Sequence, residues 1–274
     1  MPIVRPLGTM ITYGFSRGHL DADLQIARSL GVSHVEILPD WRNFPDPVPV
    51  RKRLDAEGQV LWSAHGSWGG RSVEADRVDL ADLDQTVRRA SVRDLIRCLD
   101  WIAEAGGACL VVHPGGLSSQ ADFAPRRASL AESLTELANV AALSGVIVCV
   151  ENMPPRVSPG SRTTELASLL LELNRPELAL AIDTGHAHLV SSPAEETRAA
   201  GKLLFTTHVH DNDGKRDTHL PPGLGSISWD AWRDSLDEIG YTGPIMLECI
   251  RHLRERPDSM NDRLREQLKL LTRS

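Results

Sequence analysis

Residues 178–189 read LALAIDTGHAHL, and this stretch decides the fold class. Its first half, Leu178–Asp183, begins with five successive apolar residues, so both faces of an extended chain are apolar there. Such a run is typical of a strand in a parallel sheet that helices cover on both sides. Asp183 and His186, two residue types that bind metal ions, come at its end and just beyond it. The stretch therefore predicts a buried parallel strand that ends in chemically active side chains.

The same arrangement recurs along the chain, where short apolar runs alternate with stretches of helical periodicity. The predicted strands are Met10–Gly14, His34–Leu38, Val60–Ala64, Cys109–His113, Val146–Glu151, Leu178–Asp183, Leu204–His210 and Ile245–Glu248. The predicted helices are Asp21–Leu30, Pro47–Leu54, Leu83–Ala105, Leu130–Leu143, Thr163–Leu173, Ala194–Ala200, Trp229–Ile239 and Met260–Leu271. Eight alternations favour a closed (β/α)₈ barrel, which needs about 250 residues. We therefore predict that residues 1–274 form a single α/β domain, a TIM barrel.

Glycine marks the ends of several predicted helices. Gly31, Gly106 and Gly145 each follow the last residue that fits the helical period, which is the expected helix stop. The segment Pro154–Ser161 is rich in proline and glycine and follows the fifth predicted strand. In a barrel this position belongs to a loop of the active-site face.

The composition is that of a globular protein, with 41% hydrophobic and 24% charged residues. A net charge of -7 gives no general attraction to nucleic acid or anionic membrane, so we expect neither as a partner. No apolar run approaches the roughly 20 residues of a membrane span, and no leader pattern opens the chain. The four cysteines contain no CxxC pair, which indicates free thiols. We predict a cytoplasmic protein.

Metal-binding residue types close one predicted strand after another. They are His65, His113, Glu151, Asp183, His186, His208, His210 and Glu248. A barrel gathers the carboxyl ends of its strands into one ring, and active sites lie on that face. Each residue alone could be a cap or a core side chain, but several buried carboxylates without a counter-charge are costly. A divalent cation would supply that charge, so we predict a metal site.

The ligand types favour some divalent metals over others. Imidazole and carboxylate ligands suit zinc, manganese, iron or cobalt, whereas magnesium prefers sites made only of oxygen. His208 and His210 lie two apart on a strand and so share a face; one could bind metal while the other orients a substrate. Asp217 and His219 could also chelate an ion, or could form a salt bridge within their loop.

Six further residues are candidates for substrate binding. Trp68 could form the wall of a sugar pocket, and Glu36 could line that pocket or pair with a neighbouring cation. Lys215 and Arg216 could bind a phosphate or carboxylate of a substrate, or could lie in a solvated turn. The Arg251-His252 pair, just past the eighth predicted strand, offers the same two interpretations.

Five segments carry a resemblance to a known group of proteins. They are VVHPGG at Val111–Gly116, VENMP at Val150–Pro154, AIDTGHAHL at Ala181–Leu189, HVHDNDGKRDTHLPPGLG at His208–Gly225 and GYTGPIMLE at Gly240–Glu248. Together they resemble the xylose-isomerase-like TIM barrel superfamily, which includes the sugar phosphate isomerase/epimerase family and endonuclease IV. The resemblance runs from about Met10 to Glu248. It is specific for the superfamily and much less specific for a reaction.

The resemblance to ketose epimerases implies one divalent ion, which could be manganese, cobalt, magnesium or zinc. The implied ligands are Glu151, Asp183, His208 and Glu248, with Glu151 and Glu248 also moving protons and His186 contacting the substrate. The implied reaction is an isomerisation or epimerisation of a sugar or sugar phosphate through an enediolate. Such a reaction needs a base beside the carbon and an electrophile on the oxygen, which agrees with the residue types. Barrels of this group commonly associate in pairs or fours, so we expect a homo-oligomer.

Two alternatives remain open. Endonuclease IV binds three zinc ions, and the chain has a suitable residue at each position of this wider ligand set: His65, His113, Glu151, Asp183, His186, His208, Asp217, His219 and Glu248. The first alternative is therefore a zinc phosphodiesterase that acts on abasic DNA, although the acidic run Glu74–Asp84 does not resemble a DNA-binding surface. The second is a binding or lyase subunit that acts on oxidised glycosides with a partner chain. The loop Gly223–Gly225 also departs from the Gly-Glu-Gly found in much of the family.

Overall fold

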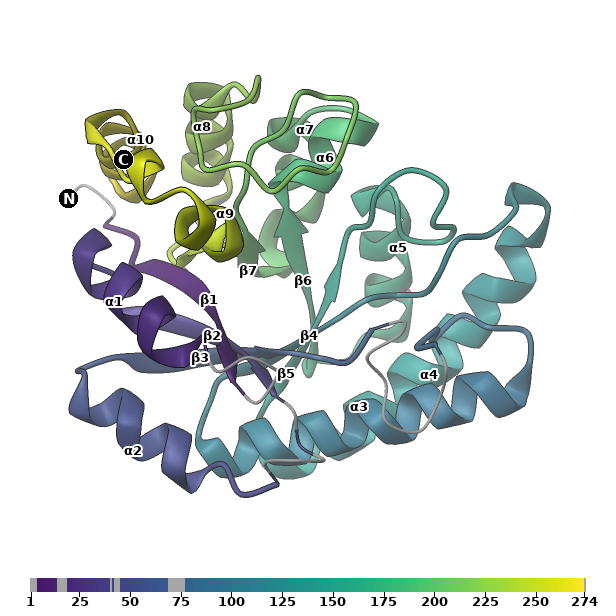
Figure 1. Cartoon of the computed structure of the whole chain (residues 1–274). Helices are drawn as coiled ribbons and strands as arrows, with labels where there is room; N and C mark the ends of the chain where they lie inside the picture. Colours follow the sequence, from purple (N-terminus) through teal and green to yellow (C-terminus); the bar gives the residue numbers. More distant parts are fainter. Residues whose placement is uncertain (1–3, 14–18, 40, 42–44, 69–76, 274) are drawn as a thin grey trace.

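Eight parallel strands form the centre of the molecule in the computed structural model, which describes residues 4–13, 19–39, 41, 45–68 and 77–273 (Figure 1). The strands are β1 Leu7–Tyr13, β2 His34–Pro39, β3 Val60–His65, β4 Cys109–Val112, β5 Ile147–Glu151, β6 Leu178–Asp183, β7 Leu204–His208 and β8 Ile245–Leu247. Their order in the sheet is β7-β6-β5-β4-β3-β2-β1-β8. Just past β7, the Val209 N–H donates to Met246 O at 2.8 Å and the Glu248 N–H donates to Val209 O at 3.0 Å. These bonds bring the two ends of the sheet together, which confirms the predicted TIM barrel.

Helices surround the strands. They are α1 Leu20–Leu30, α2 Val48–Ala56, α3 Gln85–Ala105, α4 Phe123–Ser144, α5 Thr163–Leu173, α6 Thr184–Val190, α7 Pro193–Ala200, α8 Trp229–Ile239, α9 Ile250–Glu255 and α10 Asp262–Thr272. Short 3₁₀ turns lie at Gln120–Asp122, Gly201–Leu203 and Pro257–Ser259. The helices α1 and α3 end at Gly31 and Gly106, both in the left-handed conformation, as the sequence predicts.

Some predicted bounds were wrong. The helix α4 begins at Phe123 rather than Leu130, because Pro125 lies in the first turn, where a backbone N–H has no partner within the helix. The strands β4 and β7 stop before His113 and Val209, respectively. Part of the prediction cannot be compared, since Gly14 and residues 74–76 of the acidic run lie outside the described residues.

Two short helices on the active-site face, α6 and α9, are absent from the predicted elements. The segment Thr184–His186, which directly follows the predicted strand end, is the first turn of α6. The side chain of Asp183 stabilises the start of this helix directly after the strand. It accepts a hydrogen bond from the His186 N–H at 2.7 Å and so caps α6. The helix α9 begins three residues after β8, without a side-chain cap, and carries Arg251 and His252.

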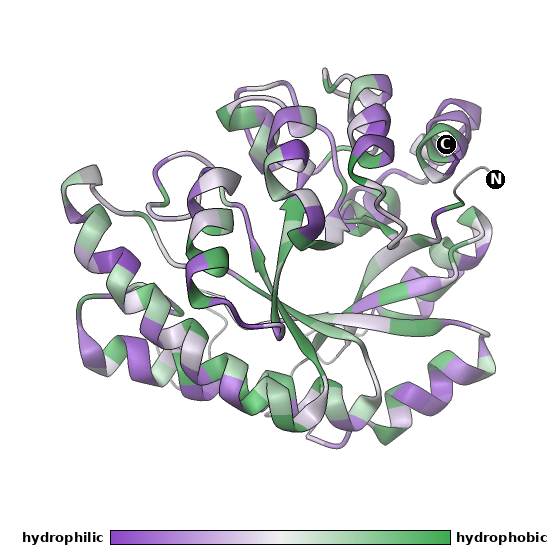
Figure 2. Cartoon of the chain, turned by 180° about the vertical axis from the view of Figure 1, so that it is seen from behind, coloured by the Kyte–Doolittle hydropathy of each residue, from purple (hydrophilic) through white to green (hydrophobic). Residues whose placement is uncertain are grey.

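The interior of the barrel has an apolar lower part. Cys109, Val111, Cys149, Ala179 and Ala181 are buried in one cluster, against which Trp62, Ile147 and Phe205 pack. A larger cluster fills the space between strands and helices. Figure 2 shows the strands as mainly hydrophobic, while the helices carry hydrophilic residues on part of their surface. All four cysteines are buried and free, as predicted.

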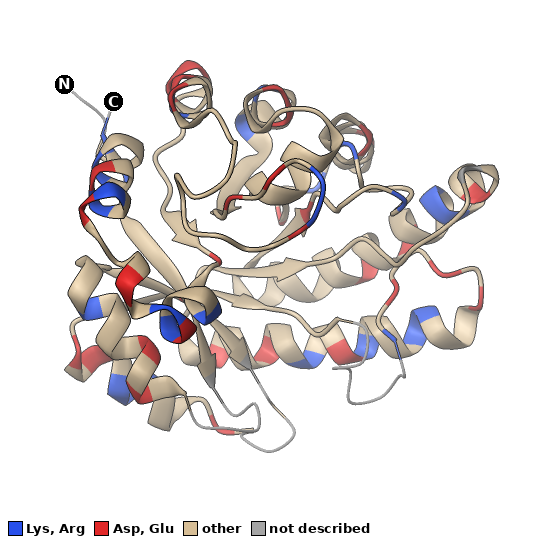
Figure 3. Ribbon diagram, turned by 45° about the horizontal axis from the view of Figure 1, so that its top comes forward, with Lys and Arg blue, Asp and Glu red and all other residues tan. Residues whose placement is uncertain are grey.

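Charged residues lie mostly on the helices and the connecting loops (Figure 3). Within the part of the chain that the structure describes, no helix combines the length and the apolar character needed to cross a bilayer.

Candidate metal centre

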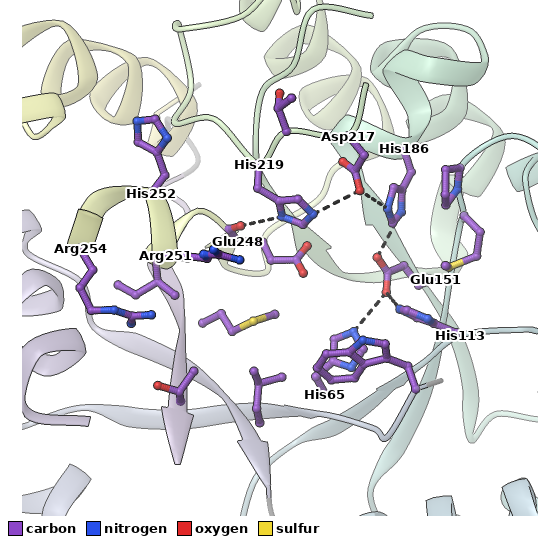
Figure 4. A pocket seen from close by; sticks show the side chains of 18 of the residues that line it. His65, His113, Glu151, His186, Asp217, His219, Glu248, Arg251, His252 and Arg254 are labelled. Atoms are coloured by element: carbon purple, nitrogen blue, oxygen red, sulfur yellow. Dashed lines mark hydrogen bonds and ion pairs between the residues drawn. The ribbon is translucent and has the colours of Figure 1, made fainter. Parts of the chain in front are cut away.

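The carboxyl ends of the strands surround a cavity of about 760 Å³. Figure 4 shows Glu151 on its polar side, with His65, His113 and His186 around it. The apolar lining residues are Met10, Leu38, Met153, Pro154 and Ile250. On the opposite side of the view, the helix α9 presents Arg251, His252 and Arg254 (Figure 4). Cavities of about 300–1,000 Å³ are typical of sites for small molecules.

Four strand ends bring potential ligand atoms together at this cavity. Glu151, Asp183, His208 and Glu248 each place one oxygen or nitrogen so that all four atoms lie within 4.8 Å of one another. His208 Nδ1 lies 3.2 Å from Glu151 Oε1 and 3.5 Å from Glu248 Oε2. The first three side chains are almost completely buried, whereas that of Glu248 is 15% exposed. The cluster is therefore closed below and opens toward the cavity.

This donor set fits a divalent cation. His208 Nδ1 and Glu248 Oε2 are buried, and neither has a hydrogen-bond partner among the described residues. Three carboxylates share the cluster, and buried carboxylates require compensating positive charge. Carboxylate oxygens with one imidazole nitrogen are suitable ligands for zinc, manganese or cobalt.

The outer residues of the wider ligand set also lie here. Glu151 Oε2 is 3.6 Å from His65 Nε2 and 3.3 Å from His113 Nε2. His186 Nδ1 lies 3.5 Å from Glu151 Oε1, and Asp217 Oδ2 is 3.3 Å from His186 Nε2 and 3.2 Å from His219 Nε2. The structure thus brings together all nine positions of the wider set.

The position of Asp183 is fixed by its neighbour strand. The side-chain amide of Asn152 donates to Asp183 O at 3.1 Å and accepts from the Asp183 N–H at 2.8 Å. The same Asp183 caps α6 and lies 3.1 Å from His210 Nε2. A ligand held from three directions needs little reorganisation when an ion binds.

The pKa values of the two glutamates in the cluster shift in opposite directions. Burial alone would raise the pKa of Glu151, but the charge of His208 and a hydrogen bond from His113 outweigh it and hold that pKa well below its usual range. Burial raises the pKa of Glu248. Burial opposes charge on His208 too, yet Glu36, Glu151 and Glu248 raise its pKa well above the ordinary value. In the metal-free protein, protonated imidazole therefore provides the positive charge of the cluster.

A comparison with protein families identifies the fold more narrowly. A family model described as xylose isomerase-like TIM barrel matches residues 24–273. The chain belongs to this family. The resemblance of the strand-end segments to that superfamily is thereby confirmed.

The relatives of this xylose isomerase-like barrel include an epimerase and an isomerase. The ketose 3-epimerase of Arthrobacter globiformis is 29% identical over 257 residues, which cover 88% of this chain and 83% of that enzyme. The inosose isomerase of Bacillus licheniformis is 28% identical over 132 residues, 46% of this chain and 48% of that enzyme. The matched part is less than two thirds of the length of several relatives, this isomerase among them. The homologues of the present chain that have an assigned activity are thus isomerases and epimerases.

A solved structure of a D-tagatose 3-epimerase-like protein superposes on the chain with a TM-score of 0.78. The two sequences are 21% identical, and the superposition covers 97% of this chain and 98% of the other. At that identity the likeness supports the fold alone.

The predicted substrate residues lie in different places. Trp68 lines the cavity, with its ring centre 4.7 Å from that of His65. Lys215 and Arg216 are exposed in a turn, where their N–H groups donate to Asp213 Oδ1, and they are not part of the cavity lining.

Glu36 and His210 are completely buried and are not among the residues that line the cavity. Glu36 Oε1 is 2.8 Å from His208 Nε2, so of its two predicted interpretations the pairing with a cationic side chain fits the geometry.

No role was predicted for Asp211, which supports the site. Asp211 is buried and accepts hydrogen bonds from the Gly223 N–H at 2.9 Å, the Ile227 N–H at 3.2 Å and Trp229 Nε1 at 3.0 Å. It thereby fixes the loop that carries Asp217 and His219. Its place directly after a predicted strand is visible in the sequence, but its partners are 12 to 18 residues away and show no local pattern.

Proposed function

We propose that this chain is a divalent-metal-dependent isomerase or epimerase of a sugar or sugar phosphate. The observation that carries the proposal is the four-donor cluster of Glu151, Asp183, His208 and Glu248 beside a cavity large enough for a monosaccharide. The names of the relatives, a ketose 3-epimerase and an inosose isomerase, support the same class of reaction.

The four clustered residues would hold one ion. A bound divalent ion supplies positive charge and an electrophile for a substrate oxygen. Glu151 and Glu248 reach the same point from different strands, since both lie within 3.5 Å of His208 Nδ1. One carboxylate removes a proton from the carbon beside the carbonyl group and the other returns a proton. Return to the same carbon from the opposite face gives an epimer, whereas return to the adjacent carbon interconverts aldose and ketose.

The first experiment measures metal content and turnover on the same preparation. Protein purified without added metal or chelator is analysed by inductively coupled plasma mass spectrometry and then incubated with a panel of ketoses and their phosphates. We expect about one divalent ion per chain, turnover of at least one sugar, loss of turnover with a chelator and recovery when the ion is restored. A chain that holds no divalent ion, or turnover unaffected by chelation, would contradict the proposal.

The isotope content of the product tests the role of the paired glutamates. In D₂O, proton removal and return by carboxylates introduces deuterium at the reacting carbon, because a carboxylic acid exchanges its proton with solvent. Conversion without deuterium in the product would mean direct hydrogen transfer between carbons and would exclude the paired-glutamate route.

A second candidate function rests on the outer ligands. The His65–His113–Glu151 and His186–Asp217–His219 contacts provide donors for further ions, as the wider ligand set of a zinc phosphodiesterase requires. Two or three zinc ions per chain together with cleavage of abasic DNA would favour this function over the first.

The remaining predictions are tested with the same pure protein. Turnover by the pure chain counts against a lyase or binding subunit that needs a partner. Light scattering measures the expected association into pairs or fours, and cell fractionation tests the predicted cytoplasmic location.

A further inference from the structure

The histidines of the candidate metal centre differ in what holds their second ring nitrogen. His65 Nδ1 lies 2.8 Å from Gly66 O, His186 Nδ1 lies 2.9 Å from Asn152 O, and His219 Nδ1 lies 3.0 Å from Glu248 O. In each case a backbone carbonyl accepts the proton, which leaves the other nitrogen directed at a carboxylate of the site. For His208 the neighbour is instead a side chain: Nε2 lies 2.8 Å from Glu36 Oε1, an ion-pair contact between two buried atoms that have no other hydrogen-bond partner among the described residues.

Glu36 lies beneath the metal cluster, inside the barrel. It is 0% exposed, and its Oε1 is 2.8 Å from His208 Nε2. Its other oxygen, Oε2, accepts a hydrogen bond from Ser63 Oγ at 2.6 Å. Glu36 and Ser63 are register partners on β2 and β3, so this carboxylate is fixed by two neighbouring strands.

The two nitrogens of His208 therefore face different carboxylates. Nε2 faces Glu36, while Nδ1 faces Glu151 and Glu248. A neutral imidazole carries one proton and offers one lone pair to a metal ion. If the proton is on Nε2, the lone pair of Nδ1 points at the cluster; if it is on Nδ1, the imidazole cannot bind the ion there.

We propose that Glu36 is a positioning residue, which holds the proton of His208 on Nε2 and thereby keeps Nδ1 available as a metal ligand. The inference rests on the proposed metal site. Glu36 does not touch the substrate in this scheme; it acts through His208, and Ser63 acts through Glu36. Carboxylates that orient metal-binding histidines in this way typically contribute a factor of about 10–100 to metal affinity.

The test uses Zn²⁺ alone as the probe, titrated into metal-free protein by calorimetry, so that no substrate is needed. Glu36→Gln keeps the shape of the side chain and removes its charge, and Glu36→Ala also removes the acceptor. We expect Zn²⁺ affinity to fall by about 10–100-fold in Glu36→Ala, by a smaller factor in Glu36→Gln and least in Ser63→Ala.

Glu196→Gln is the matched control. Glu196 is another buried glutamate, which accepts from the Thr163 N–H and from Ser191 Oγ, both at 2.7 Å, and forms an ion pair with Arg162, outside the cluster. We expect its Zn²⁺ affinity to equal that of the unmodified protein, which separates a specific effect from the loss of any buried carboxylate.

A spectroscopic measurement distinguishes orientation from mere support of the fold. Nitrogen-15 NMR of histidine-labelled, Zn²⁺-loaded protein reports which ring nitrogen of His208 carries the proton. We expect the Nε2-protonated form in the unmodified protein and a mixture of forms, or loss of the zinc-bound signal, in Glu36→Ala.

The outcomes distinguish the positioning role of Glu36 from the existence of the metal site itself. Unchanged Zn²⁺ affinity and an unchanged His208 tautomer in Glu36→Ala would overturn the inference and leave the proposed metal site intact. If Glu36→Ala does not fold, the same readouts on Glu36→Gln and Ser63→Ala decide the question. Absence of Zn²⁺ binding by the unmodified protein would overturn both the metal site and the inference.

Discussion

Along β5 the inward-facing side chain changes from Cys149 to Glu151 within one pleat, and along β6 it changes from Ala181 to Asp183. Residues two apart on a strand are only about 6.6 Å apart. The lower part of the barrel interior thus holds an apolar cluster on β4, β5 and β6, while the upper part, one step away, is a cluster of carboxylates and imidazoles.

The two parts affect folding in opposite ways. Apolar burial at the lower end stabilises the barrel, whereas buried carboxylates at the upper end oppose folding unless a proton or an ion balances them. The apolar layer also keeps water from reaching the charges from below, which strengthens every interaction among them. Whether a residue lies in the upper or the lower part of the barrel interior should therefore predict whether its substitution mainly changes function or mainly changes stability.

The largest expected effect comes from the upper layer. We expect Glu151→Gln to lower kcat/KM at least about 10³-fold, because it removes both a ligand and a proton-transfer group. The protein should stay folded with a lower melting temperature, because the lowered pKa of Glu151 means that its charge is balanced by the neighbouring imidazoles. Steady-state kinetics and thermal melting by circular dichroism measure the two effects, with Glu196→Gln as the control. Substantial turnover in Glu151→Gln would exclude its assigned role.

The next effect concerns pH and requires no substitution. Despite burial, Asp183 raises the pKa of His186 to about 10, and Glu248 with Asp217 raises the pKa of His219 to about 10. A pKa above its unfolded value of 6.5 gives stability that is fully present below pH 6.5 and is lost as the pH rises through about 10.

The melting temperature of the metal-free protein should therefore fall between about pH 7 and pH 10. A bound divalent cation would replace these protons, so the metal-loaded protein should lose much less stability over the same range. Scanning calorimetry with chelator or with excess metal makes the comparison. Equal pH dependence in both samples would contradict the idea that protonated histidines substitute for the ion.

The smallest functional effect belongs to the lower layer. The ring of Phe205 stacks on Trp62 with a centroid distance of 5.3 Å and is only partly buried. We expect Phe205→Ala to lower the free energy of unfolding by about 3 kcal/mol, the low end for a core aromatic, while metal content and kcat/KM of the folded protein stay unchanged. Urea unfolding and metal analysis test this. A loss of metal comparable to that in Glu151→Gln would show that the two layers are not independent.

The sequence predicts the upper layer well for a physical reason. Buried parallel strands are almost continuously apolar, so the polar residue at each strand end is conspicuous, and barrel topology brings those ends together. The amino-acid pattern predicts that the strand-end residues share one site, and the resemblance to ketose epimerases selects Glu151, Asp183, His208 and Glu248, whose ligand atoms do lie together in the fold.

Other parts depend on contacts that no local pattern records. Glu36 lies within β2 rather than at its end, and the role of its side chain depends on the distant His208. The short helix α6 exists because Asp183 caps it, and it is too short to show a period of its own. Lys215 and Arg216 are close to the site in sequence, yet their turn directs them outside the cavity lining.

The single carboxylate of Asp211 anchors the loop that follows β7. It holds residues 223, 227 and 229 beside the strand from which the loop departs, and Gly225 fits against it so closely that an added Cβ would lie 2.3 Å from Asp211 Oδ1. The two ends of the loop are thus clamped independently of the exposed tip at Asp213–Arg216. Insertions or exchanges in that tip should leave the anchor intact, so the tip is a suitable place for grafting a foreign loop onto this barrel.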